Sequence, residues 1–294
     1  MSTYDVAASR GAKLAHANGI EIAYSETGDG PPLVLLHGAF VSTGPAWAGS
    51  PVAHVDHLAT LAKHFRVIAP DTRGSGATVH PGGPATFDVL ANDVASLIET
   101  LGLARPAVVG FSEGGTTATV LALRHPDSVS TLVNHAGFDY FDPYAPAHQM
   151  LRPVFGGRPD ATTADPDATE RAFAGVPEMA DTLARMKADY DGAQGEGHWR
   201  DYLGQFFDRC VEPVEYGVED VGRLSMPTLI LTGDRDHFCP PSAAAAAYET
   251  LEHGELAVLP ATGHEITPAV IDTIVAFLIR YPRADVGPRD RGVA

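Results

Sequence analysis

The chain has 294 residues, of which 45% are hydrophobic and 19% charged, and it carries a formal net charge of −17. No window approaches the roughly 18 uninterrupted apolar residues that a membrane helix needs, so a soluble globular protein is expected. Nucleic acids and anionic membranes would repel so acidic a chain, and neither is expected as a partner. The first 14 residues lack the apolar segment of a signal peptide, and Cys210 and Cys239 are too few for a disulfide framework. A cytoplasmic location is therefore expected, while the sequence indicates no oligomeric state.

Strand patterns begin with residues 20–27, which alternate apolar and polar side chains and end at a Gly/Pro-rich turn. Short unbroken apolar runs bounded by Gly or Pro follow. Runs of this kind are typical of strands buried on both faces of a parallel sheet. They occupy residues 33–36, 67–69, 108–109, 229–231 and 256–259.

Helical periodicity lies between these runs, so strands and helices are predicted to alternate along the chain. The predicted helices cover residues 54–64, 87–101, 114–125, 243–251 and 266–281. In the second of them, an apolar stripe from Val89 to Leu101 leaves Asp88, Asp93 and Glu99 on the other side. Alternating strand–helix units indicate an α/β fold with a doubly wound, mostly parallel sheet flanked by helices.

One interval, residues 138–222, breaks the alternation. It contains no buried-strand run, but it has amphipathic pieces at 178–190 and 199–210, and it holds 17 acidic against 7 basic side chains. We interpret it as a helical cap inserted into a core made of residues 1–137 and 223–281. The tail, residues 282–294, is rich in Pro, Arg and Asp and is expected to be disordered.

The residues Gly110, Ser112 and Gly114 form a Gly-x-Ser-x-Gly string directly after the run at 108–109 and at the start of a predicted helix. The string alone arises often by chance, but a strand–turn–helix context is what a nucleophile elbow requires. Glycines allow a sharp turn without Cβ clashes, and a helix N-terminus favours developing negative charge. Ser112 is therefore the candidate nucleophile, and a serine nucleophile needs a base.

Among 13 histidines, His264 follows Gly263 in a short loop after the last predicted strand. Asp236 lies just beyond the strand at 229–231, so both loops are expected at the carboxyl edge of the sheet, where α/β proteins bind ligands. A carboxylate there can fix the tautomer of a histidine and stabilise its protonated form. His264 is predicted as the general base and Asp236 as the acid that orients it.

With the order Ser, Asp, His established, the sequence resembles the capped α/β-hydrolase superfamily along almost its whole length. The resemblance rests on the matches at 37–40, 71–76, 110–114, 233–236 and 263–264. It implies that the backbone N–H groups of Ala39 and Glu113 form the oxyanion hole. It also implies that the loop at 71–76 is structural, with Arg73 paired to a carboxylate.

Several alternatives stay open at this stage. The Glu113 carboxylate could be solvated or could bind a polar group of the substrate, and Asp234 and Asp139 are rival acids. The stretch 40–52 looks longer than the usual connection in the family and could add to the pocket. His54, Asp56 and His57 have no matching cluster elsewhere, so no metal site is expected, and no cofactor either.

The resulting expectation is a serine hydrolase that cleaves a carboxylic ester or lactone of a small, largely apolar substrate through an acyl-enzyme. Amide or carbon–carbon bond hydrolysis, perhydrolysis and lyase reactions use the same triad and stay open, as does a receptor-like protein with little turnover. Aromatic side chains near the expected pocket are the candidate substrate contacts. They are Phe40, Trp47, Phe111, Phe138, Trp199, Phe206 and Phe207.

Overall fold

A computed structural model describes residues 11–43, 46, 56–138, 141, 146–211 and 215–281. Its described residues form one eight-stranded sheet with the strand order β1-β2-β4-β3-β5-β6-β7-β8. The first two strands pair in the antiparallel sense, and β2 also runs antiparallel to β4, whereas all pairs from β4 to β8 are parallel. The strands are β1 Lys13–Ala17, β2 Ile20–Thr27, β3 Pro32–Leu36, β4 Arg66–Pro70, β5 Ala107–Phe111, β6 Thr131–His135, β7 Thr228–Gly233 and β8 Gly254–Leu259.

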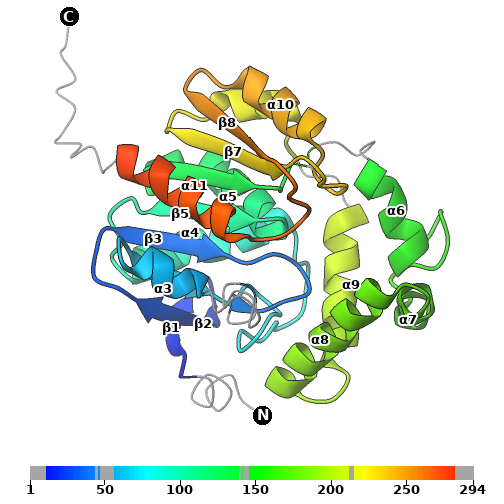
Figure 1. Cartoon of the computed structure of the whole chain (residues 1–294). Coiled ribbons are helices and arrows are strands. Elements are labelled where there is room, and N and C mark those ends of the chain that lie inside the picture. Colours follow the sequence, from blue (N-terminus) through cyan, green and yellow to red (C-terminus); the bar gives the residue numbers. More distant parts are fainter. Residues whose placement is uncertain are drawn as a thin grey trace, which may run out of the picture.

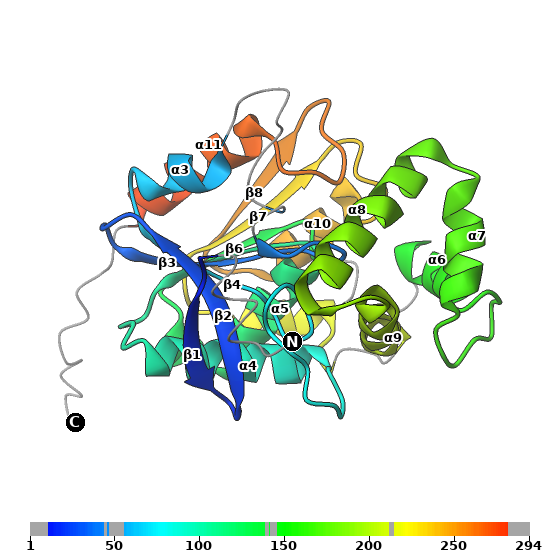
Figure 2. The ribbon, with the colours of Figure 1, turned by 90° about the horizontal axis from the view of Figure 1, so that it is seen from below.

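Helices cover both faces of this sheet, as the doubly wound pattern predicted (Figures 1 and 2). One face carries α3 and α11, and the other carries α4, α5 and α10. Their bounds are α3 His57–Ala62, α4 Phe87–Thr100, α5 Glu113–Arg124, α10 Pro241–Thr250 and α11 Pro268–Arg280, with short 3-10 turns η1 Pro126–Ser128 and η3 Val218–Arg223.

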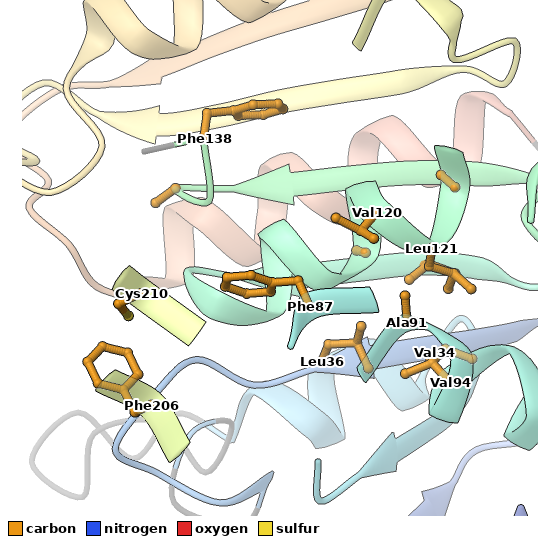
Figure 3. Packing of buried hydrophobic residues seen from close by; sticks show 14 of the residues in the cluster. Val34, Leu36, Phe87, Ala91, Val94, Val120, Leu121, Phe138, Phe206 and Cys210 are labelled. Carbon is orange, nitrogen blue, oxygen red and sulfur yellow. The ribbon is translucent and has the colours of Figure 1, made fainter. Parts of the chain in front are cut away.

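The two-residue period of a strand divides β3 between the two layers. Leu33 and Leu35 pack with α3 and α11, while Val34 and Leu36 pack with α4 and α5. All four side chains are fully buried, so each contributes about 1.5–3 kcal/mol to the stability of the core. Figure 3 shows Val34 and Leu36 beside Ala91 and Val94 of α4.

Between β6 and β7, the described residues form four helices that stand outside these layers. They are α6 Pro146–Phe155, α7 Pro166–Ala174, α8 Pro177–Gln194 and α9 His198–Val211. Figure 1 shows them beside the carboxyl ends of the parallel strands, and we refer to them as the cap. The apolar cluster of the core continues into the cap through side chains such as Phe206 and Cys210 of α9 (Figure 3). The expected boundaries at 138 and 222 remain a prediction.

Some sequence expectations need correction. The strands β1 and β6 carried no recognised signal, and β8 is not buried on both faces, because it is the edge strand and most of its residues are partly exposed. Asp93 falls outside the apolar stripe of its helix, yet it is buried, where its carboxylate pairs with the buried Arg73. None of the helices within the described ranges combines the length and apolarity needed to cross a bilayer. The tail at 282–294 lies outside the described residues.

Candidate active site

Ser112 lies at the turn between β5 and α5 with a backbone conformation of φ 53° and ψ −122°. A positive φ is sterically unfavourable for a residue with a Cβ and costs on the order of 1–3 kcal/mol, so the surrounding structure must hold it. The Ser112 N–H donates to the carbonyl of His135 at 2.8 Å, and the Ser112 carbonyl accepts from Gly115 and Thr116 at 2.8 and 3.1 Å. These bonds fix the strained turn between β6 and the first turn of α5.

The glycines that flank Ser112 are required by close backbone contacts. A Cβ on Gly110 would lie 2.0 Å from the carbonyl oxygen of Gly114, and one on Gly114 would lie 2.4 Å from that of His37. Real Cβ atoms do not approach backbone oxygens so closely, so only glycine fits at either position. Steric contacts with the backbone therefore explain both glycines of the Gly-x-Ser-x-Gly pattern in this fold.

A continuous hydrogen-bond chain connects Ser112, His264 and Asp236. The Nε2 atom of His264 lies 2.9 Å from Ser112 Oγ, and its Nδ1 atom lies 2.9 Å from Asp236 Oδ2. The Asp236 side chain is fully buried, whereas that of His264 is 21% exposed. This geometry allows His264 to accept the proton of Ser112 while a buried carboxylate holds its second nitrogen.

The position of Asp236 is set by its other oxygen. Oδ1 accepts the backbone N–H groups of Phe238 and Cys239 at 2.9 and 2.8 Å. The hydroxyl of Thr232, at the end of β7, closes the same turn by donating to the carbonyl of Cys239 at 2.7 Å. Each carboxylate oxygen therefore has its own partners, which fixes the orientation of the acid.

The rival acids differ in their surroundings. Asp234 is exposed, and its Oδ1 accepts the N–H of Thr262 at 3.2 Å, so it joins the loops after β7 and β8. Asp139 lies outside the described residues. Of the two acids that the structure describes, Asp236 contacts His264.

The loop after β3 lies against Ser112. A Cβ built on Gly38 would lie 3.2 Å from Ser112 Cβ, and Ala39 packs against the main apolar cluster. His37 is fully buried and donates through Nδ1 to the carbonyl of Gly38 at 2.7 Å, while its Nε2 accepts the N–H of Thr72 at 3.0 Å. Ala39 follows Gly38, and Glu113 follows Ser112, so the two donors proposed from the resemblance come directly after residues that approach each other. Their role in an oxyanion hole stays a prediction.

The side chain of Glu113 requires a correction, because it is neither solvated nor available to a substrate. It is 1% exposed, and its Oε1 atom lies 2.8 Å from Nε and 2.7 Å from Nη2 of Arg209 in α9. Its Oε2 atom accepts the hydroxyl of Tyr202 at 3.3 Å. A buried carboxylate beside a nucleophile is tolerable here because a buried guanidinium neutralises it.

The expected aromatic contacts fall into three groups. Phe111 lies with its ring centroid 4.9 Å from that of His264, next to the triad. Phe40 and Phe206 pack together at 4.6 Å, between the loop after β3 and the cap. The remaining positions are less informative about a pocket. Phe138 packs on Phe141, the cations of Lys187 and Arg200 lie over the ring of Trp199, and Phe207 is fully buried in the cap. Trp47 lies outside the described residues.

Two residues beside the triad were missed from the sequence. Phe238 is 38% exposed, and its ring centroid lies 5.0 Å from that of His264, so a partly exposed apolar ring lies next to this histidine. His135 ends β6 and is fully buried against Phe111 at 4.9 Å. Burial, with a smaller contribution from the nearby His264, lowers the pKa of His135 to about 3. Because β6 was not recognised in the sequence, no local signal pointed to His135.

The loop at 71–76 is tied to its neighbours. Asp71 accepts the N–H groups of Thr43 and Ala77 at 3.0 and 2.8 Å, and Arg73 forms a two-point ion pair with Asp93 at 2.8 and 2.6 Å. This is the structural role that the resemblance implied. His57 contacts the carbonyl of Ile266 at 3.2 Å and Asp56 caps α3, while His54 lies outside the described residues.

Comparison with known proteins agrees with this architecture. Residues 31–267 match the family described as alpha/beta hydrolase fold. A 2-hydroxy-6-oxo-6-(2'-aminophenyl)hexa-2,4-dienoic acid hydrolase of Metapseudomonas resinovorans is 27% identical over 93% of this chain and 92% of its own, and a non-heme haloperoxidase of Rhodococcus erythropolis is 26% identical over 90% and 97%. The solved structure of a thermophilic esterase from Thermogutta terrifontis, with malate bound, is 25% identical over 92% of this chain and 98% of that one, with a TM-score of 0.70. The chain therefore belongs to the alpha/beta hydrolase fold family.

Proposed function

We propose that this protein is a serine hydrolase that cleaves a carboxylic ester or lactone through an acyl-enzyme. In this mechanism Ser112 Oγ attacks the substrate carbonyl while His264 Nε2 takes its proton. His264 then returns the proton to the leaving alcohol, and a water activated by the same histidine releases the acid. The observation that carries the proposal is the hydrogen-bond chain Asp236–His264–Ser112, with both bonds at 2.9 Å.

Negative charge that develops on the carbonyl oxygen needs hydrogen-bond donors. We assign this role to the backbone N–H groups of Ala39 and Glu113, which follow the segments that meet at Ser112. Removing one such donor typically costs about 3–4 kcal/mol of transition-state stabilisation. The N-terminus of α5 adds a favourable field for the same charge.

The substrate class follows from the side chains around the base. Phe111 and Phe238 flank His264, and Phe40 and Phe206 meet where the cap approaches the loop after β3. Apolar walls of this kind favour a small or medium-sized substrate of low polarity. This small molecule is the only partner that we propose, and a cytoplasmic location stays a prediction.

Carbon–carbon bond hydrolysis is the second candidate, because the relative from Metapseudomonas resinovorans is named for a dienoic acid substrate. An unpaired cationic side chain in the site would favour an acidic substrate of that class. Arg209, the buried cap cation that reaches the elbow, already pairs with Glu113. The ester or lactone reaction is therefore preferred.

A panel of p-nitrophenyl esters with increasing acyl length tests the proposal. The wild type is expected to turn over the shorter esters, and Ser112→Ala is expected to lose at least about 10⁴-fold in kcat while keeping its Tm. The length at which kcat/KM declines reports the longest acyl chain that the site accepts. A well-folded wild type that cleaves no ester or lactone, but whose Tm a small molecule raises, would instead indicate a receptor-like protein.

A further inference from the structure

A cluster of three buried polar side chains connects the cap to the elbow outside the triad. Arg209 and Tyr202 lie on α9, and Glu113 begins α5 directly after the nucleophile. Arg209 donates through Nε to Glu113 Oε1 at 2.8 Å and through Nη1 to the carbonyl of Ala85 at 3.2 Å. The Tyr202 hydroxyl donates to Glu113 Oε2 at 3.3 Å. We call Glu113, Tyr202 and Arg209 the α9 latch.

Because the α9 latch is buried, separating its side chains costs a large free energy. The three side chains are at most 2% exposed, and separating a buried ion pair leaves uncompensated charges in a medium of low polarity. Burial, together with the adjacent Glu113 carboxylate, raises the pKa of Tyr202, so its hydroxyl stays protonated and remains a donor. A movement of α9 away from the sheet would have to break these contacts, so the cap is held against the elbow.

The latch also reaches the loop after β3. The backbone N–H of Phe40 donates to the Tyr202 hydroxyl oxygen at 3.4 Å. Phe40 has a φ of 66°, which is strained for a residue with a side chain, and its ring packs on Phe206 of α9 and Phe155 of α6 at 4.6 and 5.5 Å. Side chains of the cap thus fix the conformation of the residue next to Ala39.

We propose that the α9 latch aligns the oxyanion hole, with Tyr202 as the positioning residue that connects its two halves. One half is the N–H of Glu113, whose side chain the latch holds, and the other is the N–H of Ala39, whose neighbour Phe40 it holds. This inference rests on the proposed function. It implies that catalysis requires the cap to be docked against the elbow, because the same contacts hold the cap and align the oxyanion hole.

The test is Tyr202→Phe, which keeps the ring in the core and removes the one hydroxyl that joins Phe40 to Glu113. Misaligned donors weaken the transition state more than the bound substrate, so kcat for a p-nitrophenyl ester is expected to fall about 10–100-fold with KM within about threefold. A trifluoromethyl ketone that adds to Ser112 mimics the tetrahedral state, and its Ki is expected to rise by the same factor as kcat/KM falls. The pH at half-maximal kcat/KM should not move, because His264 and Asp236 keep their contacts.

Thr169→Val is the matched control, since it also removes a buried hydroxyl from the cap. Thr169 lies in α7, and its hydroxyl is 3.1 Å from the carbonyl oxygen of Asp165 and 3.4 Å from that of Val154, both within the cap, so its one proton is donated inside the cap. Wild-type kcat and Ki are expected for this variant. If Tyr202→Phe equals the wild type in kcat, or if its kcat falls while Ki is unchanged, the positioning role is wrong. A wild type without esterase turnover refutes the proposed function instead.

Arg209 supplies a second comparison. Arg209→Lys keeps a cation beside Glu113 and is expected to retain more kcat than Arg209→Gln, which leaves the buried carboxylate unpaired. Folded protein with wild-type kcat in both variants would contradict the latch. If Arg209→Gln does not fold, the Tyr202→Phe measurement decides the question alone.

Discussion

The two carboxylate oxygens of Asp236 have different partners. Even the replacement of one oxygen by an NH₂ group, as in asparagine, would therefore disturb the hydrogen bond to His264. Oδ1 accepts two backbone N–H groups, and Oδ2 accepts the Nδ1 proton of His264. A carboxylate satisfies all three donors at once, because it accepts through both oxygens. The turn at Phe238 and Cys239 therefore helps to orient the carboxylate that contacts His264.

Replacing Asp236 by Asn is expected to lower kcat by about 10⁴-fold. The amide oxygen would stay with the N–H groups of Phe238 and Cys239, so its NH₂ group would face His264 Nδ1. The proton would then sit on Nε2, which could no longer accept from Ser112. Steady-state hydrolysis of a p-nitrophenyl ester measures the loss.

Asp234→Asn is the control for that experiment, because Asp234 is the neighbouring acid on the same loop and is exposed. Wild-type kcat is expected for it. A large loss in Asp234→Asn together with an active Asp236→Asn would exchange the roles of the two acids.

The sequence could predict the contact between Ser112, His264 and Asp236, because each follows a predicted strand and parallel strands end at one edge of the sheet. It could not predict the partner of Glu113. Arg209 lies 96 positions away in a cap helix, and the contact depends on how that helix docks. His135 was missed for a related reason, since nothing in its local pattern indicates the burial that β6 acquires inside the sheet.

At the scale of elements, the elbow depends on the close approach of α5 to β3. Gly114 lies where a Cβ would come within 2.4 and 2.6 Å of the carbonyl oxygens of His37 and Leu36. Neither oxygen can retreat without moving the central strand. Glycine at position 114 is therefore needed both for the packing of α5 against the sheet and for the shape of the turn at Ser112.

Gly114→Ala is expected to lower the free energy of unfolding by about 3 kcal/mol or more, because the added methyl group meets backbone on a central strand. Gly204→Ala in α9 provides the comparison, since a Cβ there would meet nothing within 4 Å. Alanine is the better helix former, so that variant is expected to gain about 0.5–1 kcal/mol. Urea unfolding monitored by circular dichroism gives both values, and equal stability of the two variants would contradict the steric argument.

Elements with a strong hydrophobic period could be predicted nearly to their ends, as the pattern at 87–101 and the observed α4 Phe87–Thr100 show. The strands β1 and β6 could not. The first mixes Lys and His with small residues, and the second ends in Asn134 and His135, so neither forms an apolar run. Their pairing in the sheet overrides the weak local pattern.

At the scale of the whole molecule, several fully or partly buried histidines affect stability in acid. Burial lowers the pKa values of His57, His80 and His125, and it lowers that of His135 most, to about 3. Between this value and the ordinary value of 6.5, the unfolded chain binds a proton at position 135 that the folded chain does not. The free energy of unfolding therefore falls as the pH falls from 6.5 toward 3, and His135 has no such effect above that window.

The variant His135→Leu is expected to lose part of this acid sensitivity, because leucine has a similar volume and no proton to bind. Its Tm should fall less steeply than that of the wild type between pH 6.5 and about 4, with parallel curves above pH 7, since each proton contributes up to about 1.4 kcal/mol per pH unit. Differential scanning fluorimetry across this range measures the effect. Parallel curves at all pH values would show that His135 does not stay neutral in the folded protein.

The whole-molecule arrangement could be predicted in outline, because alternating strands and helices permit few topologies and the interruption at 138–222 marks an excursion from them. How the cap docks could not be predicted. That depends on contacts such as Phe40 with Phe206 and Arg209 with Glu113, which join segments far apart in the chain.

The central claim is that Ser112 is the nucleophile, and covalent labelling tests it most directly. A fluorophosphonate should form one adduct per chain, found by peptide mass spectrometry on the peptide that contains Ser112. Ser112→Ala should not be labelled, and p-nitrophenyl ester turnover of the wild type should disappear as the adduct forms. An adduct on another residue, or ester turnover that survives complete labelling of Ser112, would contradict the account.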